Sequence, residues 1–437
     1  MKSVRGLCLK KKKGFLRNRI NWIIIFGIFI RIAYMLYTPI TVRSHDLGEL
    51  SLKGTGHAAY LLNIMEGHFP YTNDLQFYQQ PFYYLLSAGL AKFLKVCIPN
   101  LTIYQMLSAS KIISCLASCL LLFVVKKLGE TVELKMTGME ILMLYVAFTP
   151  VFYLRGGSVG PDMLAMFFIT VEFLWTLYWE KNPDWKNTLI LAVLYGLGVT
   201  TKISCAIVAI YTSIVFLKKL WIDTSKKNIV SLLKKYICFG MVSLPLGLWY
   251  SVRNYIKFQQ PLNYVPNVGR QSELYVGDHS FAARFLFIDL KNLIKSPFCA
   301  VEEDYNAPVY FVKSSLFGEF SFEVPLWMPR LLLYIAVGIS VFLIAAIIRN
   351  IRYISENYGK DILFVSALYY TSIIIFNIKY PYGCSMDFRY MGFLAIMAGI
   401  IMGRYGEYLI GKEYGITVKI LFYGYSFFSI WMYLWIA

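Results

Sequence analysis

Long apolar runs are the feature that most constrains this chain. Stretches such as "NWIIIFGIFIRIAYMLYTPI" (21–40) and "WMPRLLLYIAVGISVFLIAAII" (327–348) reach the roughly 17 to 20 residues that cross a bilayer as a helix. Of the 437 residues, 58% are hydrophobic and 16% are charged, which is too little polar surface for a water-soluble domain of this size. The chain is therefore predicted to be an all-α, polytopic integral membrane protein.

The apolar segments predict about eleven membrane spans. They lie near 20–39, 102–126, 138–155, 161–179, 187–201, 203–219, 234–252, 328–349, 361–378, 389–409 and 416–435. The segment 81–98 is treated apart because it carries Lys92 and Lys95 and begins at a proline. If it crossed fully, the basic loop 218–235 would lie opposite the N-terminus, against the positive-inside rule. We therefore expect an interfacial or partly inserted helix at 81–98.

Positive charge gathers in the segments that this topology places in the cytoplasm. The formal net charge is +18, and its clusters are "MKSVRGLCLKKKKGFLRNR" at the N-terminus, 218–235 and 349–360. Short basic loops between spans are typical of cytoplasmic segments rather than of a nucleic-acid surface. We expect a multi-pass plasma-membrane protein with a cytoplasmic N-terminus and no nucleic-acid partner. Residues 1–437 are expected to form a single membrane domain with external loops at 40–101 and 253–327.

Ionisable side chains gather where the chain leaves its first span. The stretch "PITVRSHDLGEL" (39–50) holds Arg43, His45, Asp46 and Glu49. One reading makes Asp46 the N-cap of a short helix with Glu49 three residues later, a capping box. The other makes Asp46 a base at the membrane surface that takes a proton from an incoming hydroxyl. In that reading His45 orients Asp46 and Arg43 keeps it ionised.

The rest of this loop adds an expected helix and three histidines. The run "GHAAYLLNIMEGHFP" (56–70) has helical spacing and ends at a glycine and a proline, which predicts a short interfacial helix. His45, His57 and His68 are spaced too widely for a compact metal motif. No metal ligand is assigned from them, and a divalent cation is kept as an open alternative.

Aromatic and amide side chains follow in "LQFYQQPFYYLL" (75–86). Tyr83 and Tyr84 match the aromatic belt that lines membrane interfaces. A second reading makes them a platform for a sugar ring, with Gln79 and Gln80 bonding its hydroxyls. The belt reading is the simpler of the two.

Four cations stand at predicted external ends or turns, namely Arg155, Lys202, Arg253 and Arg389. Singly, each fits a side chain that extends toward lipid headgroups. Together, on the same face as Asp46, they favour a bound anion, because arginine and lysine are the usual phosphate partners.

Two long-range pairings are also open. Arg31 lies within the first span, where an ionisable group is expensive, and Glu172 is a candidate partner. Cys299 and Cys384 are both expected outside, where a disulfide between them is an alternative to free thiols. The sequence has no GxxxxGK[ST], no GxGxxG after a strand, no GxSxG and no HExxH, so it offers no nucleotide-binding loop. An enzyme of this kind would take an activated substrate from the membrane.

An ordered set of short motifs resembles a known superfamily. It consists of "TVRSHDLGEL", "GHAAYLLNIMEG", "QFYQQPFYYLL", "GPDML", "GLGVTTK", "SLFGEF" and "MDFRY". Over nearly the whole chain these motifs resemble the multispan GT-C glycosyltransferases, in the branch of protein O-mannosyltransferases and aminoarabinose transferases. The stretch Arg43–Ser44–His45–Asp46 departs from the paired acidic residues of the O-mannosyltransferases, which puts the acceptor type in doubt.

The resemblance implies roles for particular residues. Asp46 would be the catalytic base, Lys202 and Arg389 would contact the donor phosphate, and Asp387 would support Arg389. Pro161 and Asp162 would shape the donor cavity, and 317–319 would lie over it. The candidate set is catalytic Asp46 and His45; phosphate-binding Lys202, Arg389, Arg253 and Arg155; and substrate-binding Arg43, Glu49, His57, Gln79, Gln80, Tyr83, Asp162 and Asp387.

The predicted function is a membrane glycosyltransferase. It would move a sugar from a polyprenyl-phosphate donor to an acceptor hydroxyl on the extracytoplasmic face with inversion, because a single base requires no covalent intermediate. The partners would be that donor, membrane lipid, and a glycan, lipid or protein acceptor. The alternative is a transporter or flippase, for which charges at mid-membrane such as Arg31, Lys111 and Glu172 would be the mark.

Overall fold

The computed structural model describes residues 19–72, 75–222, 225–262, 264–266, 268–352, 358–410 and 414–435. Within these ranges the regular secondary structure is helical, and the recorded β feature is an isolated bridge between Tyr275 and Tyr382. Residues 1–18 of the basic N-terminal run, with Cys8, lie outside the described residues, as do 223–224 and 353–357 of the predicted basic segments.

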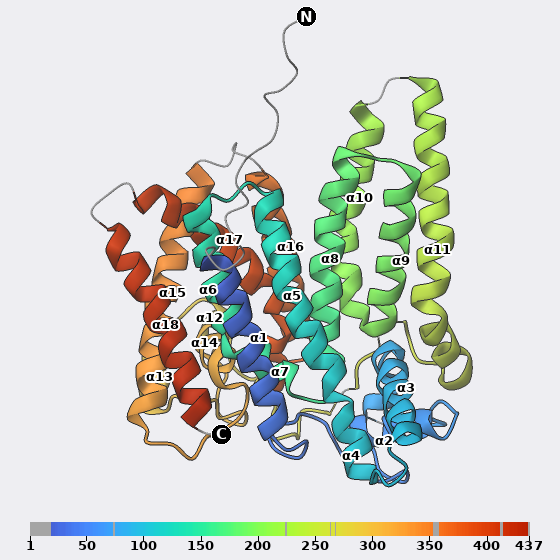
Figure 1. The fold of residues 1–437 in the computed structure, drawn as a ribbon, viewed down its shortest axis with the longest axis horizontal. Coiled ribbons are helices and arrows are strands. Elements are labelled where there is room, and N and C mark those ends of the chain that lie inside the picture. Colours follow the sequence, from blue (N-terminus) through green and yellow to red (C-terminus); the bar gives the residue numbers. More distant parts are fainter. Residues whose placement is uncertain are drawn as a thin grey trace, which may run out of the picture.

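Long helices form two groups that stand side by side (Figure 1). One group contains α8 (Asp162–Lys181), α9 (Trp185–Thr201), α10 (Ile207–Ile222) and α11 (Lys226–Phe258). The other contains α1 (Arg19–Tyr37), α6 (Met136–Phe148), α15 (Trp327–Arg352), α17 (Gly392–Ile410) and α18 (Gly415–Trp435). Helix α5 (Lys111–Thr131) joins the groups, because it packs on α8 and also on α1 and α6. Helix α16 (Gly359–Lys379) contacts α10 and α17, and so also reaches both groups.

Seven helical stretches among the described residues are long and apolar enough to cross a membrane, or up to eight if α6 and α7 (Pro150–Gly156), bent by 45°, form one span. The prediction of an all-helical, multi-pass membrane protein agrees with this. Each of the eleven predicted segments contains helix, but α9, α17 and α18 are not among the seven. The count of eleven and the orientation in the membrane stay predictions.

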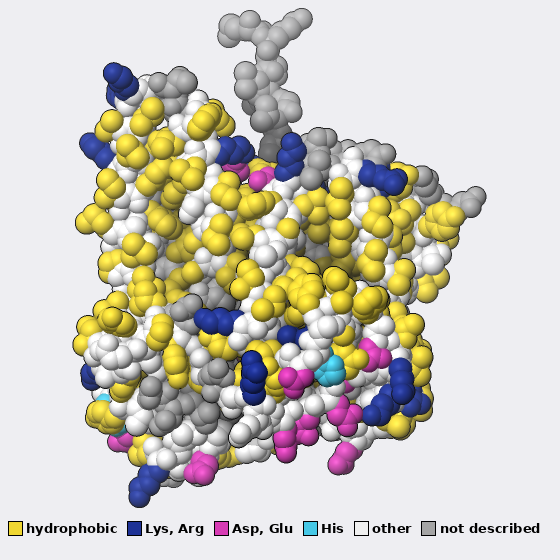
Figure 2. Space-filling model, turned by 180° about the vertical axis from the view of Figure 1, so that it is seen from behind, with side chains coloured by type: hydrophobic (Ala, Val, Ile, Leu, Met, Phe, Trp, Pro, Cys, Tyr) yellow, Lys and Arg dark blue, Asp and Glu magenta, His cyan; other side chains and the backbone are white. Residues whose placement is uncertain are grey.

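Short helices gather at one end of the bundle, the lower end in Figure 1, which we call the loop end. They are α2 (Gly56–Met65), α3 (Phe82–Cys97), α4 (Ile103–Ala109), α12 (Phe281–Phe285), α13 (Leu290–Lys295) and α14 (Ala307–Phe317). The 3-10 turns within the described residues are η2 (Leu75–Tyr78), η3 (Ile203–Ala206), η4 (Gly383–Met386) and η5 (Phe388–Tyr390). Figure 2 shows hydrophobic side chains over the wall of the bundle and Asp and Glu side chains gathered at the loop end. Helix α3 packs on α2 and α4 there; its partial insertion stays a prediction.

The predicted capping box at Asp46 is wrong. The helix begins ten residues later, at Gly56, with Thr55 as N-cap and no side-chain cap. Asp46 instead contributes its backbone carbonyl, which accepts a hydrogen bond of 2.8 Å from the His57 N–H. Asp46 has a φ of 54°, a left-handed conformation that a β-branched residue would not tolerate. The Asp46 carboxylate therefore does not cap the helix.

Two pairings that the sequence left open are not formed. Arg31 does not meet Glu172: its guanidinium donates to the Ser118 hydroxyl and to the carbonyls of Gly27 and Ala147 at 2.7–2.8 Å. These carbonyls satisfy a buried guanidinium without a carboxylate. Cys299 and Cys384 are both free thiols, so the alternative of a disulfide between them is not realised.

Candidate functional site

A polar cavity of about 470 Å³ opens at the loop end. Segments far apart in the sequence meet around it: the loop after α1, the start of α8, the break between α9 and η3, the loop after α14 and the turns η4 and η5. Its ionisable lining residues are His45, Asp46, His57, Asp162, Lys202, Glu319 and Arg389, with several tyrosines and Cys384.

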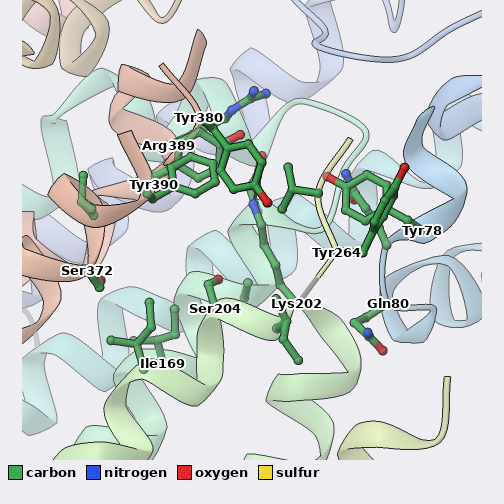
Figure 3. A pocket seen from close by; sticks show the side chains of 18 of the residues that line it. Tyr78, Gln80, Ile169, Lys202, Ser204, Tyr264, Ser372, Tyr380, Arg389 and Tyr390 are labelled. Carbon is green, nitrogen blue, oxygen red and sulfur yellow. Dashed lines mark hydrogen bonds and ion pairs between the residues drawn. The ribbon is translucent and has the colours of Figure 1, made fainter. Parts of the chain in front are cut away.

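An apolar cavity of about 430 Å³ adjoins the polar one. Side chains from α8, η3, α10, α16 and α17 line it, among them Ile169, Ile203, Ile207, Ile373 and Phe393. Both cavities are lined by Asp162, Lys202, Arg389, Tyr380 and Tyr390. Figure 3 shows Lys202 rising from its helix end, with Ser204, Tyr390 and Tyr380 on one side of it and Tyr264, Tyr78 and Gln80 on the other. Charged groups thus stand where the polar and apolar cavities join.

Asp46 is the most accessible carboxylate of the polar cavity. Its side chain is 43% exposed, whereas that of Asp162 is 16% exposed and those of Glu319 and Asp387 are 5% and 0% exposed. One oxygen of Asp46 lies 3.7 Å from the Arg389 guanidinium. An exposed carboxylate with one distant cation keeps lone pairs free to accept a proton.

Lys202 owes its position to the end of α9. The helix stops at Thr201, and Lys202 takes an extended conformation (φ −158°, ψ 131°) before η3 begins. Its ammonium group forms an ion pair with Asp162, the first residue of α8, and lies 4.7 Å from the centre of the Tyr390 ring. The ammonium is therefore held at the junction of the two cavities by one carboxylate and one aromatic face.

Asp387 contacts both the backbone and the side chain of Arg389. Asp387 is fully buried, accepts the Arg389 backbone N–H at 2.9 Å and lies 3.6 Å from its side-chain Nε. Arg155, on α7, donates to the same Asp387 oxygen at 2.8 Å. The two guanidiniums balance the buried carboxylate and leave an excess of positive charge. Arg155 therefore contacts Asp387 but does not line the polar cavity.

His45 lies between two carboxylates. Its Nδ1 is 3.2 Å from Glu319, and its Nε2 is 3.4 Å from Asp387. Burial and the positive charges of Arg155 and Arg389 hold the pKa of His45 well below its usual range, so the ring is neutral. Glu319 also accepts the Tyr310 hydroxyl at 2.7 Å, and burial together with Asp387 raises its pKa to about 7.

The ligand atoms of His45, Glu319 and Asp387 lie within 4.8 Å of one another, a spacing that could hold a metal ion. The charges around them do not fit one. Asp387 already takes the two guanidiniums, Glu319 takes the Tyr310 hydroxyl, and a divalent cation would face Arg155 and Arg389 at close range. No step of the function proposed below uses a metal ion.

His57 also lines the polar cavity. Its Nδ1 is 2.6 Å from the Tyr84 hydroxyl, which donates to the Gln79 side chain at 3.0 Å. Because that hydroxyl has one proton to give, the Nδ1 of His57 carries the proton between the two, and its Nε2 is an acceptor. Burial is the main cause that lowers the pKa of His57 to about 4.

Other candidates lie away from the polar cavity. Arg253 donates to the Pro70 carbonyl at 2.8 Å and stacks over Tyr250, so it fixes the loop after α2. Tyr83 is fully buried and donates to the Ser110 carbonyl. Arg43 lies over the Phe322 ring and does not line either cavity, and neither does the exposed Glu49.

The remaining amides lie at the cavities. Gln79 lines both, whereas Gln80 lines the apolar one and donates to the Ser251 hydroxyl at 2.6 Å. From the sequence, Glu319 was expected only to lie in a loop over the cavity, and neither Tyr390 nor Tyr78 was a candidate residue. The signal for Glu319 was its "SLFGEF" motif; Tyr78 and Tyr390 had none that sets them apart from the other tyrosines.

Comparisons with known proteins add little. No protein-family model matches the chain, and no curated protein matches it. The solved structures that match include the crystal structure of ArnT from Cupriavidus metallidurans in the apo state, which is 12% identical with a TM-score of 0.40. The match covers 89% of this chain and 78% of that one. A likeness of this degree assigns neither residues nor substrates to this chain.

Proposed function

We propose that this protein is a membrane glycosyltransferase that moves a sugar from a polyprenyl-phosphate donor to an acceptor hydroxyl on the extracytoplasmic face. The observation that supports it is the junction of the two cavities: an exposed carboxylate, Asp46, shares the polar cavity with Lys202 and Arg389, and an apolar cavity begins at these cations. A lipid phosphate has a charged group joined to a hydrocarbon chain. Its phosphate would match the cations, and its chain would match the apolar cavity.

The donor would lie across the junction. Its first isoprene units would fill the apolar cavity, where each buried CH₂ contributes about 0.8 kcal/mol. Its phosphate would contact Lys202 and Arg389, and the sugar would project into the polar cavity. Lys202 would then exchange part of its contact with Asp162 for the phosphate.

The reaction would be a single displacement. The acceptor oxygen forms a bond to C1 of the sugar while the bond from C1 to the phosphate oxygen breaks. Asp46 takes the hydroxyl proton, and polyprenyl phosphate leaves with the electron pair. Lys202 and Arg389 stabilise the charge that develops on it. The configuration at C1 inverts because the acceptor oxygen attacks C1 on the face opposite to the leaving phosphate, and only one displacement occurs.

The transporter alternative loses two of its three sequence supports. Arg31 is bonded to Ser118 and to backbone carbonyls, and Lys111 donates to the carbonyls of Met35 and Thr38 at 2.6–2.7 Å. Both side chains therefore have structural partners within the helix bundle. Glu172 remains without a recorded hydrogen bond.

The Asp46→Asn variant tests the proposal. The amide cannot take a proton, so transfer should fall by about 100-fold or more, whereas binding of a lipid phosphodiester should persist. Mass spectrometry would compare the envelope glycans of cells that lack the gene and carry wild-type, Asp46→Asn or Glu66→Gln protein. Glu66 is an exposed carboxylate that does not line either cavity. The proposal predicts restored glycans with wild type and Glu66→Gln only. Full restoration by Asp46→Asn would remove Asp46 from its role.

A further inference from the structure

We propose that residues 281–294, in the loop between α11 and α14, lie in the membrane interface at the loop end and insert their apolar side chains among the lipids. The segment contains α12 and α13, two of the short helices of that end (Figure 1). It belongs to the loop 253–327, for which the sequence predicted an external position. The partner of this surface is lipid, and the inference does not depend on the proposed function.

The outward side of this segment is apolar. Phe285 and Leu293 are buried, but the other large apolar side chains of the segment are 50% to 68% exposed. Exposed apolar patches of this kind mark sites that contact a protein partner or a membrane. The exposed side chains are those of Phe281, Leu286, Phe287, Ile288, Leu290 and Ile294.

The inward side of the same segment makes polar contacts, which inverts the pattern of a loop in water. Arg284 is buried, and its guanidinium donates to the Asn377 carbonyl at 3.0 Å. Asn306 is also buried, and its side-chain amide donates to the carbonyls of Ala283 and Phe287 at 2.8 Å. Hydrogen bonds thus hold the segment from within while its apolar side chains face outward. This arrangement suits lipid surroundings, where backbone groups need partners inside the protein.

A charged network supports α13 from the same inward side. Lys313 is fully buried, donates to the Asn292 side chain and lies 3.6 Å from the buried carboxylate of Asp304. Asn292 in turn donates its side-chain amide to Asp304. The two opposite charges satisfy each other inside the protein. Insertion of the outward side chains therefore carries no unpaired charge from this network into the lipid.

The contacts of the segment place it beside helices that are candidates to span the membrane. The Asn377 carbonyl that Arg284 binds belongs to the last turn of α16, one of these helices, and Ile375 and Ile378 near that end are exposed. Helices α12 and α13 pack on α14, which packs on α15. Helix α15, another candidate span, begins at the exposed Trp327. The apolar surface of the segment therefore continues that of the helix wall at the level where tryptophan is typical of a membrane interface.

Two lysines accompany the apolar side chains. Lys291 is exposed, and so is Lys295, which forms an ion pair with Glu303 at 3.0 Å. A lysine stem can lie along apolar surface while its ammonium group reaches the lipid headgroups. Apolar side chains with lysines beside them match the boundary between hydrocarbon and headgroups.

Photo-crosslinking in nanodiscs tests which molecule covers the segment. The full chain would carry p-benzoylphenylalanine in place of Phe287 or, as the control, in place of Glu273, an exposed acidic residue of the same loop. After irradiation, mass spectrometry should find lipid adducts at position 287 and few or none at position 273. Crosslinks from position 287 to a second copy of the chain, or equal lipid adducts at the two positions, would overturn the proposal.

Thiol accessibility gives a second measurement on the same two positions. Phe287→Cys and Glu273→Cys proteins in nanodiscs would react with a sulfonated maleimide, and peptide mapping would separate each new thiol from the native cysteines. Because apolar surroundings disfavour the reactive thiolate, the thiol at position 287 should react about tenfold more slowly or less. After unfolding, the two thiols should react alike. A thiol at position 287 that reacts in nanodiscs as fast as the one at position 273 would show that the segment lies in water, and would overturn the proposal.

Discussion

At the residue scale, the four carboxylates of the site differ in their exposure and in their partners. Asp46 is exposed with one distant arginine, Asp162 is paired with Lys202, and Asp387 is buried under two arginines. Glu319 is buried with a tyrosine and a histidine as its close polar contacts. These differences in surroundings follow from the position of each carboxylate in the fold, not from its residue type.

His57 gives a prediction at this scale. Its pKa is about 4 in the folded protein and about 6.5 when exposed, so the unfolded chain binds more protons between these values. Stability should therefore be complete above about pH 6.5 and fall as the pH drops toward 4, by up to about 3 kcal/mol for this group. Thermal unfolding of wild type and His57→Gln at about pH 7 and pH 5 would measure it. The variant should lose less stability between the two values; equal losses would contradict the assignment.

At the scale of elements, the loop before α2 presents Asp46 by lying directly on the start of that helix. The Asp46 and Leu47 carbonyls accept the N–H groups of His57 and Ala58 at 2.8 and 2.9 Å. Gly56 makes this approach possible: it has a φ of +88°, and a Cβ there would be 2.6 Å from the Asp46 carbonyl oxygen. The first turn of α2 is thereby capped by the backbone of the loop.

The matched pair Gly56→Ala and Gly67→Ala tests this contact. Both glycines have positive φ, +88° and +91°, but a Cβ on Gly67 would have nothing within 4 Å. Gly67→Ala should cost about 1 kcal/mol from backbone strain alone and leave transfer intact. Gly56→Ala should cost about 2–3 kcal/mol and also reduce transfer, because the loop must move. Glycan analysis and thermal unfolding would measure both. Equal effects of the two substitutions would contradict the role of the contact.

The sequence predicted the elements better than the contacts. Apolar runs such as 327–348 are long enough to predict helices from length and composition alone, and loop charges led to the expectation that Asp46 and Arg389 share a face. Their approach to 3.7 Å across 343 positions agrees with that expectation. The left-handed turn at Asp46, the Glu319–His45 contact and the diversion of Arg253 to Pro70 were not predictable. Each depends on side-chain geometry between distant segments, which local periodicity does not encode.

At the scale of the whole molecule, two helix groups stand side by side (Figure 1). The apolar cavity adjoins the polar cavity at the loop end, and the two share lining residues. The apolar cavity lies between helices of both groups, α8 and α10 from one and α17 from the other, with α16 alongside. A lipid with a charged head would meet apolar side chains first and cations next. Under the proposed function, the sugar transfer would take place at the loop end.

The most direct measurement is a cryo-EM structure of the protein in nanodiscs with undecaprenyl phosphate. The account predicts the phosphate within contact distance of Lys202 and Arg389, the first isoprene units between Ile169 and Ile373, and the Asp46 carboxylate facing the open side of the phosphate. A phosphate bound outside the polar cavity, or lipid density that never enters the apolar one, would contradict it.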